Sequence, residues 1–158
     1  IDHIDTRIKE PKSIVKKMEK KKYKKTYYNL IEKINDIAGM RIVCTLKDDI
    51  FFIKDLVKQI PDIHILNEKD YVTNPKPSGY SSYHMIVEVP VKLSQKTIYV
   101  KCEIQIRTLA MDFWASFEHK VKYKTEQEVN KKTSKELVNC AKMISKFDDK
   151  MISLKNIQ

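Results

Sequence analysis

The segment that most constrains the fold is residues 97–107, TIYVKCEIQIR, in which apolar and polar side chains alternate along the chain. A period of two predicts a β-strand that buries one face and keeps the other in a polar environment. The buried row would be Val100, Cys102, Ile104 and Ile106, and the polar row Lys101, Glu103, Gln105 and Arg107. The chain must therefore build a sheet covered on one side. The polar row is either a solvent-facing surface or the floor of a polar site.

The rest of the chain predicts an α+β domain with one mixed β-sheet flanked by helices. Residues 1–11 show no clear period and are expected to be irregular. We expect strands at 39–46, 63–72 and 83–91, the last paired with 97–107 through a short polar turn. We expect helices at 12–26, 47–60, 108–124 and 131–157, with helix or turn at 27–36. A chain of 158 residues is long enough for one domain with its own core.

Apolar side chains at helical spacing predict which face of each long helix is buried. In the helix 47–60 these are Ile50, Ile53, Val57 and Ile60, and Pro61 ends the helix. In the helix 108–124 they are Leu109, Phe113, Phe117 and Val121. The last helix carries Leu137, Ala141, Ile144, Phe147, Met151 and Leu154. This last stripe suits packing on the same domain or on another subunit.

The net charge of +10 is concentrated near the start of the chain. Residues 7–25 contain ten Lys or Arg against two Glu, a net charge of +8. Such a concentration suits an anionic partner, such as nucleotide phosphates, nucleic acid or membrane lipid. A solvated, lysine-rich helix face gives the same pattern.

Cysteines and hydropathy indicate the compartment. Cys44, Cys102 and Cys140 are far apart, lack metal-ligand spacing and lie among apolar residues. We interpret them as buried thiols in a reducing compartment. The sequence shows neither a signal peptide nor a long apolar run, which predicts a cytoplasmic protein with no membrane partner.

The loop NPKPSGYSSYH, residues 74–84, contains one of the two glycines of the chain. Gly79 lets the backbone turn sharply, and Tyr80 beside it is free to present its ring as a stacking surface for a nucleobase. Lys69 and Lys76 would supply positive charge for phosphates. The alternative is a surface loop whose tyrosine is anchored in the core.

Two carboxylates from distant segments are candidates for metal and proton chemistry. Asp36 is the last residue of the segment 27–36, predicted as helix or turn, and precedes the strand 39–46, and Glu103 lies in the polar row. Two carboxylates at one end of a sheet can hold Mg²⁺, which keeps waters and phosphate oxygens as further ligands. One of them could also accept a proton from an attacking hydroxyl. Taken singly, each is more typical of an ordinary surface charge.

The basic segment RIKEPKSIVKK suits nucleotide phosphates. Arg7 and Lys9 are spaced as on an extended chain, whereas Ser13 and Lys17 fall on the first turns of a helix. A helix N-terminus with cations nearby favours phosphate, and Arg7 or Arg41 can lie flat against a base. The sequence has neither a GxxxxGK[ST] nor a GxGxxG motif, so a glycine-rich cradle would not hold the nucleotide.

Four segments resemble, in order and spacing, the synthetase domain of the RelA/SpoT superfamily: RIKEPKSIVKKM, INDIAGMRIVC, KDYVTNPKPSGYSSYH and CEIQIRTLAMDFWASFEHKVKYK. The sequence is most similar to the single-domain small alarmone synthetases. The resemblance implies a nucleotidyltransferase-like fold, with a synthetase domain at 1–125 and a C-terminal helical extension at 126–158. It also implies transfer of pyrophosphate from ATP to the ribose 3′-hydroxyl of GDP or GTP, with release of AMP.

The resemblance further implies a role for each candidate residue. Asp36 and Glu103 would bind Mg²⁺, and Glu103 and Asp36 would act in catalysis together with His84. The ATP side would consist of Arg7, Lys9, Ser13, Lys17 and Arg41. The guanosine-nucleotide side would consist of Lys69, Lys76, Tyr80, His84 and Gln105, with Tyr80 stacked on guanine. Arg107 is given a structural role.

The residues leave two other functions open. Some relatives of this domain pyrophosphorylate the 3′ end of tRNA, and the basic helix suits that acceptor too. A non-catalytic RNA-binding module would use the lysines electrostatically, but it would not need two convergent carboxylates. The C-terminal stripe favours a homo-oligomer, which the resemblance suggests to be a tetramer. The family has helices before the Arg7 segment, and their near absence here would alter oligomerisation or nucleotide closure. The lack of a His-Asp hydrolase module before the synthetase and of regulatory domains after it favours a monofunctional synthetase.

Overall fold

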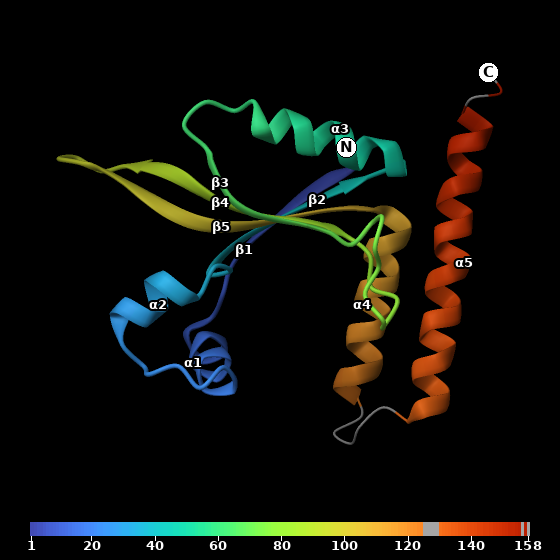
Figure 1. Cartoon of the computed structure of the whole chain (residues 1–158), viewed down its shortest axis with the longest axis horizontal. Helices are drawn as coiled ribbons and strands as arrows, with labels where there is room; N and C mark the ends of the chain where they lie inside the picture. The colour runs from blue at the N-terminus through green and yellow to red at the C-terminus, as the bar shows by residue number, and fades with distance from the viewer. Residues whose placement is uncertain (125–129, 156, 158) are drawn as a thin grey trace.

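The computed structural model describes residues 1–124, 130–155 and 157, and it contains a five-stranded mixed sheet (Figure 1). The strands lie in the order β1-β2-β5-β4-β3. Their bounds are β1 His3–Ile8, β2 Ala38–Cys44, β3 His64–Asp70, β4 Tyr83–Lys92 and β5 Thr97–Thr108. Strands β2 and β5 run parallel, and the other neighbouring strands run antiparallel. The predicted α+β class with a mixed sheet is confirmed.

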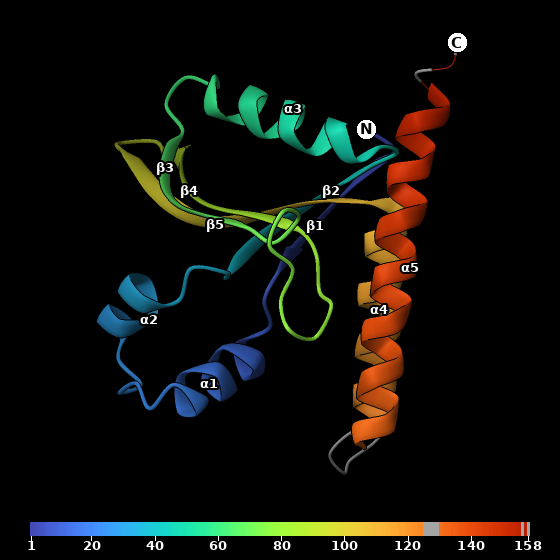
Figure 2. The same cartoon turned by 45° about the vertical axis from the view of Figure 1, so that its right-hand side comes forward.

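Helices flank the sheet on both faces and at one end. Their bounds are α1 Pro11–Lys20, α2 Tyr27–Lys33, α3 Lys47–Lys58, α4 Leu109–Lys124 and α5 Lys131–Lys155. Helix α3 covers one face of the sheet, α1 and α2 lie on the opposite side, and α4 and α5 run side by side at one end (Figures 1 and 2). We call the face turned away from α3 the open face. It lies between the α1–α2 pair and the α4–α5 pair.

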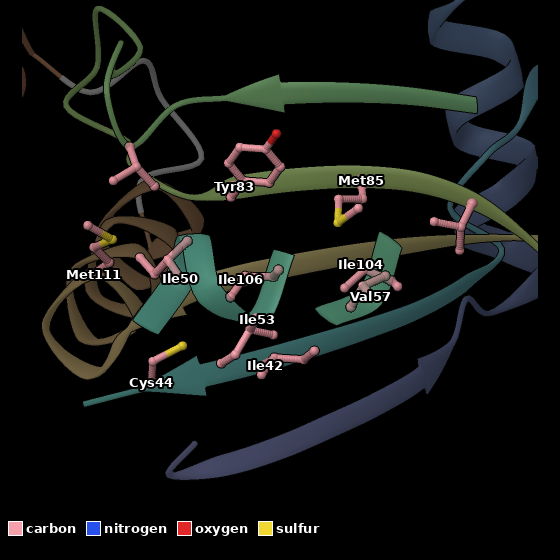
Figure 3. Packing of buried hydrophobic residues seen from close by; sticks show 12 residues of the cluster. Ile42, Cys44, Ile50, Ile53, Val57, Tyr83, Met85, Ile104, Ile106 and Met111 are labelled. Atoms are coloured by element: carbon pink, nitrogen blue, oxygen red, sulfur yellow. The ribbon is translucent and has the colours of Figure 1, made fainter. Parts of the chain in front are cut away.

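The core lies between the sheet and α3 (Figure 3). Apolar side chains of α3 and β5 belong to one buried cluster, which includes Ile50, Ile53, Val57, Ile104 and Ile106. Ile60 was expected on the same inner face but is 47% exposed, because the helix ends at Lys58. Since the apolar row of β5 faces this core, its polar row faces the open side.

Residues 3–8 form a strand, so the prediction that residues 1–11 are irregular is wrong. Strand β1 pairs with β2 along its whole length, from His3 opposite Val43 to Ile8 opposite Ala38. All side chains of β1 are exposed, so no buried row marks it in the sequence. The pairing fixes Arg7 on a strand at the edge of the sheet.

The predicted core stripe of α4 is also wrong. Leu109, Phe113 and Phe117 are 43%, 70% and 49% exposed, whereas Met111 and Trp114 are 4% and 3% exposed. The helix turns this second face inward. The stripe instead forms an apolar strip on the surface, where the rings of Phe113 and Phe117 stack with centroids 6.5 Å apart.

The stripe predicted on the last helix divides between buried and exposed positions. Leu137 is 6% exposed, whereas Phe147 and Leu154 are 56% and 47% exposed. Helix α5 also buries a carboxylate, Asp148, which accepts a hydrogen bond of 2.8 Å from the Thr108 hydroxyl. Part of the stripe therefore packs on this domain. The expected boundary between residues 125 and 126 lies outside the described residues.

The three cysteines are free thiols that differ in exposure. Cys44 is buried, and burial raises the pKa of its thiol to about 11. Cys102 is half-buried and Cys140 is exposed, so the prediction of three buried thiols is wrong for Cys140. In the part of the chain that the structure describes, no helix is both long enough and apolar enough to span a membrane.

Candidate active site on the open face

Strand register gathers the polar candidates of different strands on the open face. Gly39 of β2 lies opposite Arg7 of β1 on one side and opposite Glu103 of β5 on the other. A second row, two residues further along β2 and β5, crosses the sheet through Arg41, Gln105, His84 and Lys69. Residues that are far apart in the sequence thus become neighbours across the strands.

The Glu103 carboxylate lies within reach of two hydrogen-bond donors. Gln105 Nε2 donates to its Oε2 at 2.9 Å, and His84 Nδ1 lies 3.4 Å from its Oε1. Burial favours the neutral acid, but the hydrogen bonds from His84 and Gln105 outweigh burial and hold the pKa of Glu103 below its ordinary value. The carboxylate is therefore ionised at neutral pH, able to accept a proton or to bind a cation.

Five side chains form a closed ring of hydrogen bonds that includes Glu103. Arg107 Nη2 donates to the Tyr80 hydroxyl at 2.9 Å and also to Gln105 Oε1. The Tyr80 hydroxyl bonds His84 Nε2 at 2.8 Å. In the tautomer of a neutral His84 that carries its proton on Nδ1, facing Glu103, Nε2 accepts from the Tyr80 hydroxyl. In this five-residue ring, one branch runs from Arg107 through Tyr80 and His84 to Glu103, and the other runs from Arg107 through Gln105 to Glu103.

Arg107 connects several side chains of the site. Its side chain is 4% exposed, Nη1 lies 3.3 Å from Asp112 Oδ1, and Cζ lies 5.4 Å from the centroid of the Tyr80 ring. Asp112 also lies 3.4 Å from Arg41 Nη1. The sequence signal for Arg107 is its place in the polar row of β5. Asp112 carries no signal beyond its position in the first turn of α4.

Asp36 lies just before β2 and is paired with two ammonium groups. The Nζ atoms of Lys9 and Lys17 lie 2.5 and 2.7 Å from Asp36 Oδ2. Burial opposes the charged form, but the hydrogen bonds from Lys17 and Lys9 outweigh it and keep the pKa of Asp36 below its ordinary value. Its other oxygen, Oδ1, is buried and accepts no hydrogen bond from the described residues. An ionised carboxylate with an unpaired buried oxygen fits a cation ligand.

Asp36 and Glu103 interact electrostatically. Burial and the Asp36 charge both raise the pKa of Glu103, against the hydrogen bonds that lower it. Within residues 1–124, 130–155 and 157, no three His, Cys, Asp or Glu side chains form a cluster that could hold a metal ion. Mg²⁺ needs fewer protein ligands, because one or two carboxylates, waters and substrate phosphates complete its shell. The pair therefore fits Mg²⁺ that arrives with a nucleotide, and binding of one ion by both carboxylates stays a prediction.

A cavity of about 450 Å³ opens between the sheet and α4. Its lining includes Arg7, Arg41, Tyr80, Gln105 and Arg107. The lining residues from α4 are Ala115, Ser116, Glu118, His119 and Lys120. A smaller cavity of about 80 Å³ lies over Gly39, between Arg7 and Glu103. Cationic walls beside an aromatic ring suit a nucleotide, whose phosphates and base need these two kinds of contact.

The loop between β3 and β4 carries Tyr80 and Lys76. Lys76 Nζ lies 4.9 Å from the centroid of the Tyr80 ring, a distance typical of a cation–π contact. Gly79 has a φ of +92°, as the conformational argument from the sequence requires. The structure adds a steric reason for glycine at position 79, since a Cβ at this position would lie 2.6 Å from Ala141 Cβ on α5.

Two other candidates lie at the margins of this site. Lys69 is exposed on β3, opposite His84 of β4. Ser13 is exposed in the first turn of α1, and its backbone N–H donates to the Glu10 carbonyl at 2.9 Å. This N–H is therefore already engaged. A phosphate at Ser13 would be bound through the hydroxyl.

Comparison with known proteins gives a consistent result. Residues 6–128 match the family described as the region found in RelA / SpoT proteins. GTP pyrophosphokinase YwaC of Bacillus subtilis (strain 168) is 45% identical over 155 residues, which cover 98% of this chain and 74% of that protein. Small alarmone synthetase 1 from Bacillus subtilis bound to its product pppGpp is similar with a TM-score of 0.91 and 35% identity, covering 99% of this chain and 79% of that chain. The structure of that synthetase bound to AMPCPP gives a TM-score of 0.81 at 30% identity, covering 99% and 77%.

Proposed function

The chain belongs to the RelA/SpoT family as a small alarmone synthetase, and from this premise we propose that it makes ppGpp and pppGpp from ATP and GDP or GTP. The ribose 3′-oxygen attacks the β-phosphorus of ATP and forms a new P–O bond. The bond between the β-phosphorus and the oxygen that bridges it to the α-phosphorus breaks, and AMP leaves. The observation on this chain that carries the proposal is Glu103, an ionised carboxylate held by two donors on the open face.

Glu103 accepts the proton of the attacking 3′-hydroxyl. The five-residue ring orients its carboxylate, since Gln105 and His84 donate to different oxygens. A positioned base of this kind contributes about 10²- to 10⁴-fold to the rate. Because the pKa of Glu103 is below its ordinary value, the base is ready at neutral pH and is lost as the pH falls toward that pKa.

The ATP side is formed by cations from the first elements of the chain. Arg7 and Arg41 line the large cavity, and Lys9 and Lys17 lie at Asp36. Ser13 lies at the start of α1, where its hydroxyl would reach a phosphate. Mg²⁺ held by Asp36 and Glu103 would neutralise phosphate charge and polarise the group being transferred. The lysines would offset the remaining negative charge, so that two anionic nucleotides can approach each other.

The guanosine nucleotide lies on the side of β3, β4 and their loop. Tyr80 offers its ring to guanine, and Lys76 and Lys69 bring positive charge to the phosphates. His84 and Gln105 are neighbours across β4 and β5; His84 links the Tyr80 hydroxyl to Glu103, and Gln105 links Arg107 to Glu103. The same hydrogen-bonded ring thus contacts the acceptor base at one end and the reacting hydroxyl at the other.

An assay with three acceptors tests the proposal. The purified chain is incubated with Mg²⁺ and ATP labelled in its β-phosphate, together with GDP, GTP or tRNA. Label in a guanosine tetra- or pentaphosphate, with stoichiometric AMP and loss of turnover on chelation of Mg²⁺, is the expected result. Label in tRNA alone would support the tRNA-modifying function. The absence of transfer to any acceptor, with salt-sensitive binding of RNA, would support a binding module.

We also infer that the chain forms a homo-oligomer, for which a tetramer is the expected size. Phe113 and Phe117 of α4 are 70% and 49% exposed, and Phe147 of α5 is 56% exposed. Large apolar side chains exposed on two adjacent helices are typical of a protein–protein interface. Size-exclusion chromatography with light scattering measures the mass directly, and a monomer at micromolar concentration would contradict the inference.

A further inference from the structure

We propose that α5 positions the guanosine-nucleotide site, and that Ala141 is the residue through which it holds the loop carrying Tyr80. The inference rests on the proposed function only in that Tyr80 contacts the guanosine substrate. It concerns a helix that lies outside the polar rows of the open face. Both views show the loop between β3 and β4 beside the α4–α5 pair (Figures 1 and 2).

The loop backbone lies directly against α5 at Gly79, the residue before Tyr80. A Cβ at Gly79 would meet Ala141 Cβ at 2.6 Å, Trp114 Cζ2 at 3.3 Å and Val138 Cα at 3.5 Å. The first distance is far below a van der Waals contact, so the loop and the helix approach as closely as two small residues allow. A larger side chain at position 141 therefore displaces the loop or α5 unless it turns into the adjoining cavity, which Ala141 also lines.

Helix α5 is a firm support for this contact, because hydrogen bonds tie it to other elements. The Trp114 indole N–H of α4 donates to the Leu137 carbonyl of α5 at 3.0 Å. The Thr108 hydroxyl at the end of β5 donates to the buried Asp148 of α5 at 2.8 Å. Since these bonds lie on both sides of Ala141 along the helix, the loop is the part that yields when the contact is crowded.

A cavity of about 240 Å³ adjoins the contact between the loop, α4 and α5. Its lining includes Pro75 and Gly79 from the loop, and Met111, Val138 and Ile144 from the two helices. Because of this cavity, the loop is not closely packed against α4 and α5 on that side, and it has room to shift. The contact at Gly79 decides where the loop stops, and with it where the adjacent Tyr80 ring lies.

The contact should affect one substrate and spare the other. Tyr80 and Lys76 belong to the loop, whereas Lys9, Lys17 and Asp36 lie near β1, α1 and the start of β2. A displaced loop therefore weakens guanosine-nucleotide binding more than ATP binding, although Arg7 and Arg41 of the ATP side share a cavity with Tyr80. General damage to the fold would raise the Michaelis constants of both substrates.

The test is a graded series at position 141, Ala141→Ser, Ala141→Val and Ala141→Leu. We expect the KM for GDP or GTP to rise with side-chain volume, reaching about tenfold or more for leucine, because small misplacements of binding groups are costly. The KM for ATP should stay within about twofold. The matched control is Cys140→Leu, a similar enlargement at the neighbouring, exposed position of α5.

Tryptophan fluorescence gives a second readout that needs no turnover. Trp114 is the single tryptophan of the chain and lies in the contact, so its emission reports displacement of the loop. A shifted emission in the valine and leucine variants, but not in Cys140→Leu, is expected. Circular dichroism melts establish that each variant is folded. If the leucine variant does not fold, the valine variant decides the outcome.

Two results would overturn the proposal. One is a folded leucine or valine variant with an unchanged KM for the guanosine nucleotide, and the other is an equal rise in both Michaelis constants. Wild-type turnover is measured first, because it tests the proposed function separately from the role of Ala141. An inactive wild type would refute the proposed function, whereas an active wild type with insensitive variants would refute only the role of Ala141.

Discussion

Replacing Tyr80 by phenylalanine and by alanine separates the two tasks proposed for this residue. Phenylalanine keeps the ring that stacks on guanine and removes the hydroxyl that closes the five-residue ring. That hydroxyl accepts from Arg107 at 2.9 Å and bonds His84 at 2.8 Å, and the Arg107 side chain is only 4% exposed. Without it, two partners with little access to water lose a hydrogen bond.

The magnitude follows from this geometry. An unsatisfied buried polar group costs about 1–3 kcal/mol, which corresponds to a roughly 5- to 150-fold loss if it is expressed in the chemical step. We expect Tyr80→Phe to lower kcat within this range, because His84 and Glu103 lose their orientation, and to leave the KM of GDP or GTP nearly unchanged. Tyr80→Ala also loses base stacking, worth about 1–3 kcal/mol, and should raise that KM by a similar factor.

The assay is steady-state synthesis of the tetra- and pentaphosphate at saturating ATP, with GDP or GTP varied. Tyr99→Phe is the matched control, since it removes a hydroxyl from a half-exposed ring on the same sheet that stacks on His64. A phenylalanine variant with wild-type kcat would refute the argument from the ring of hydrogen bonds. An alanine variant with a wild-type KM for the guanosine nucleotide would refute stacking on Tyr80.

Other changes test separate parts of the structure. Glu103→Gln keeps the shape of the side chain and should lower kcat by at least about 10²-fold with an unchanged circular dichroism spectrum; turnover near wild type would exclude Glu103 as the base. Phe113→Lys places a charge at a 70% exposed position of α4 and should lower the mass measured by light scattering, whereas an unaltered mass would remove this residue from the subunit interface. Asp148→Asn should flatten the pH dependence of stability. Burial raises the pKa of Asp148 in the folded protein, so the wild type loses stability as the pH rises from the ordinary carboxyl pKa of about 4 toward the raised value. Thermal melts across this range should show the slope in the wild type and in the exposed control Asp48→Asn, and its persistence in Asp148→Asn would contradict the assignment.

Sequence periodicity predicted the elements whose burial is one-sided. The alternation of 97–107 identified β5 and assigned Glu103 and Gln105 to the polar face, because a central strand covered by α3 must bury every second side chain. The same alternation did not identify β1, because all of its side chains are exposed at the sheet edge. The apolar stripe of α4, with residues four apart, led to a wrong prediction of the buried face for a related reason. Such spacing marks one face of a helix without saying whether the domain or another surface covers it.

The sequence predicted which residues are candidates for the site, but it did not predict the hydrogen bonds between them. Asp36, Glu103 and Tyr80 were found through the motifs that resemble the family, and the structure places Asp36 near enough to Glu103 to affect its pKa. The five-residue ring depends on the register between β4 and β5, which sets His84 opposite Gln105. No local pattern encodes that register. The packing of Gly79 on Ala141 likewise depends on a contact between residues far apart in the sequence.

The way the site is distributed along the chain has an evolutionary consequence. The residues assigned to ATP come from β1, the residue after it, α1 and β2, whereas the groups assigned to the guanosine nucleotide come from β3, β4, their loop and β5. These two parts meet across β2 and β5, where Gly39 lies opposite Glu103. Substitutions in one part can therefore change the affinity for one nucleotide while the affinity for the other stays the same.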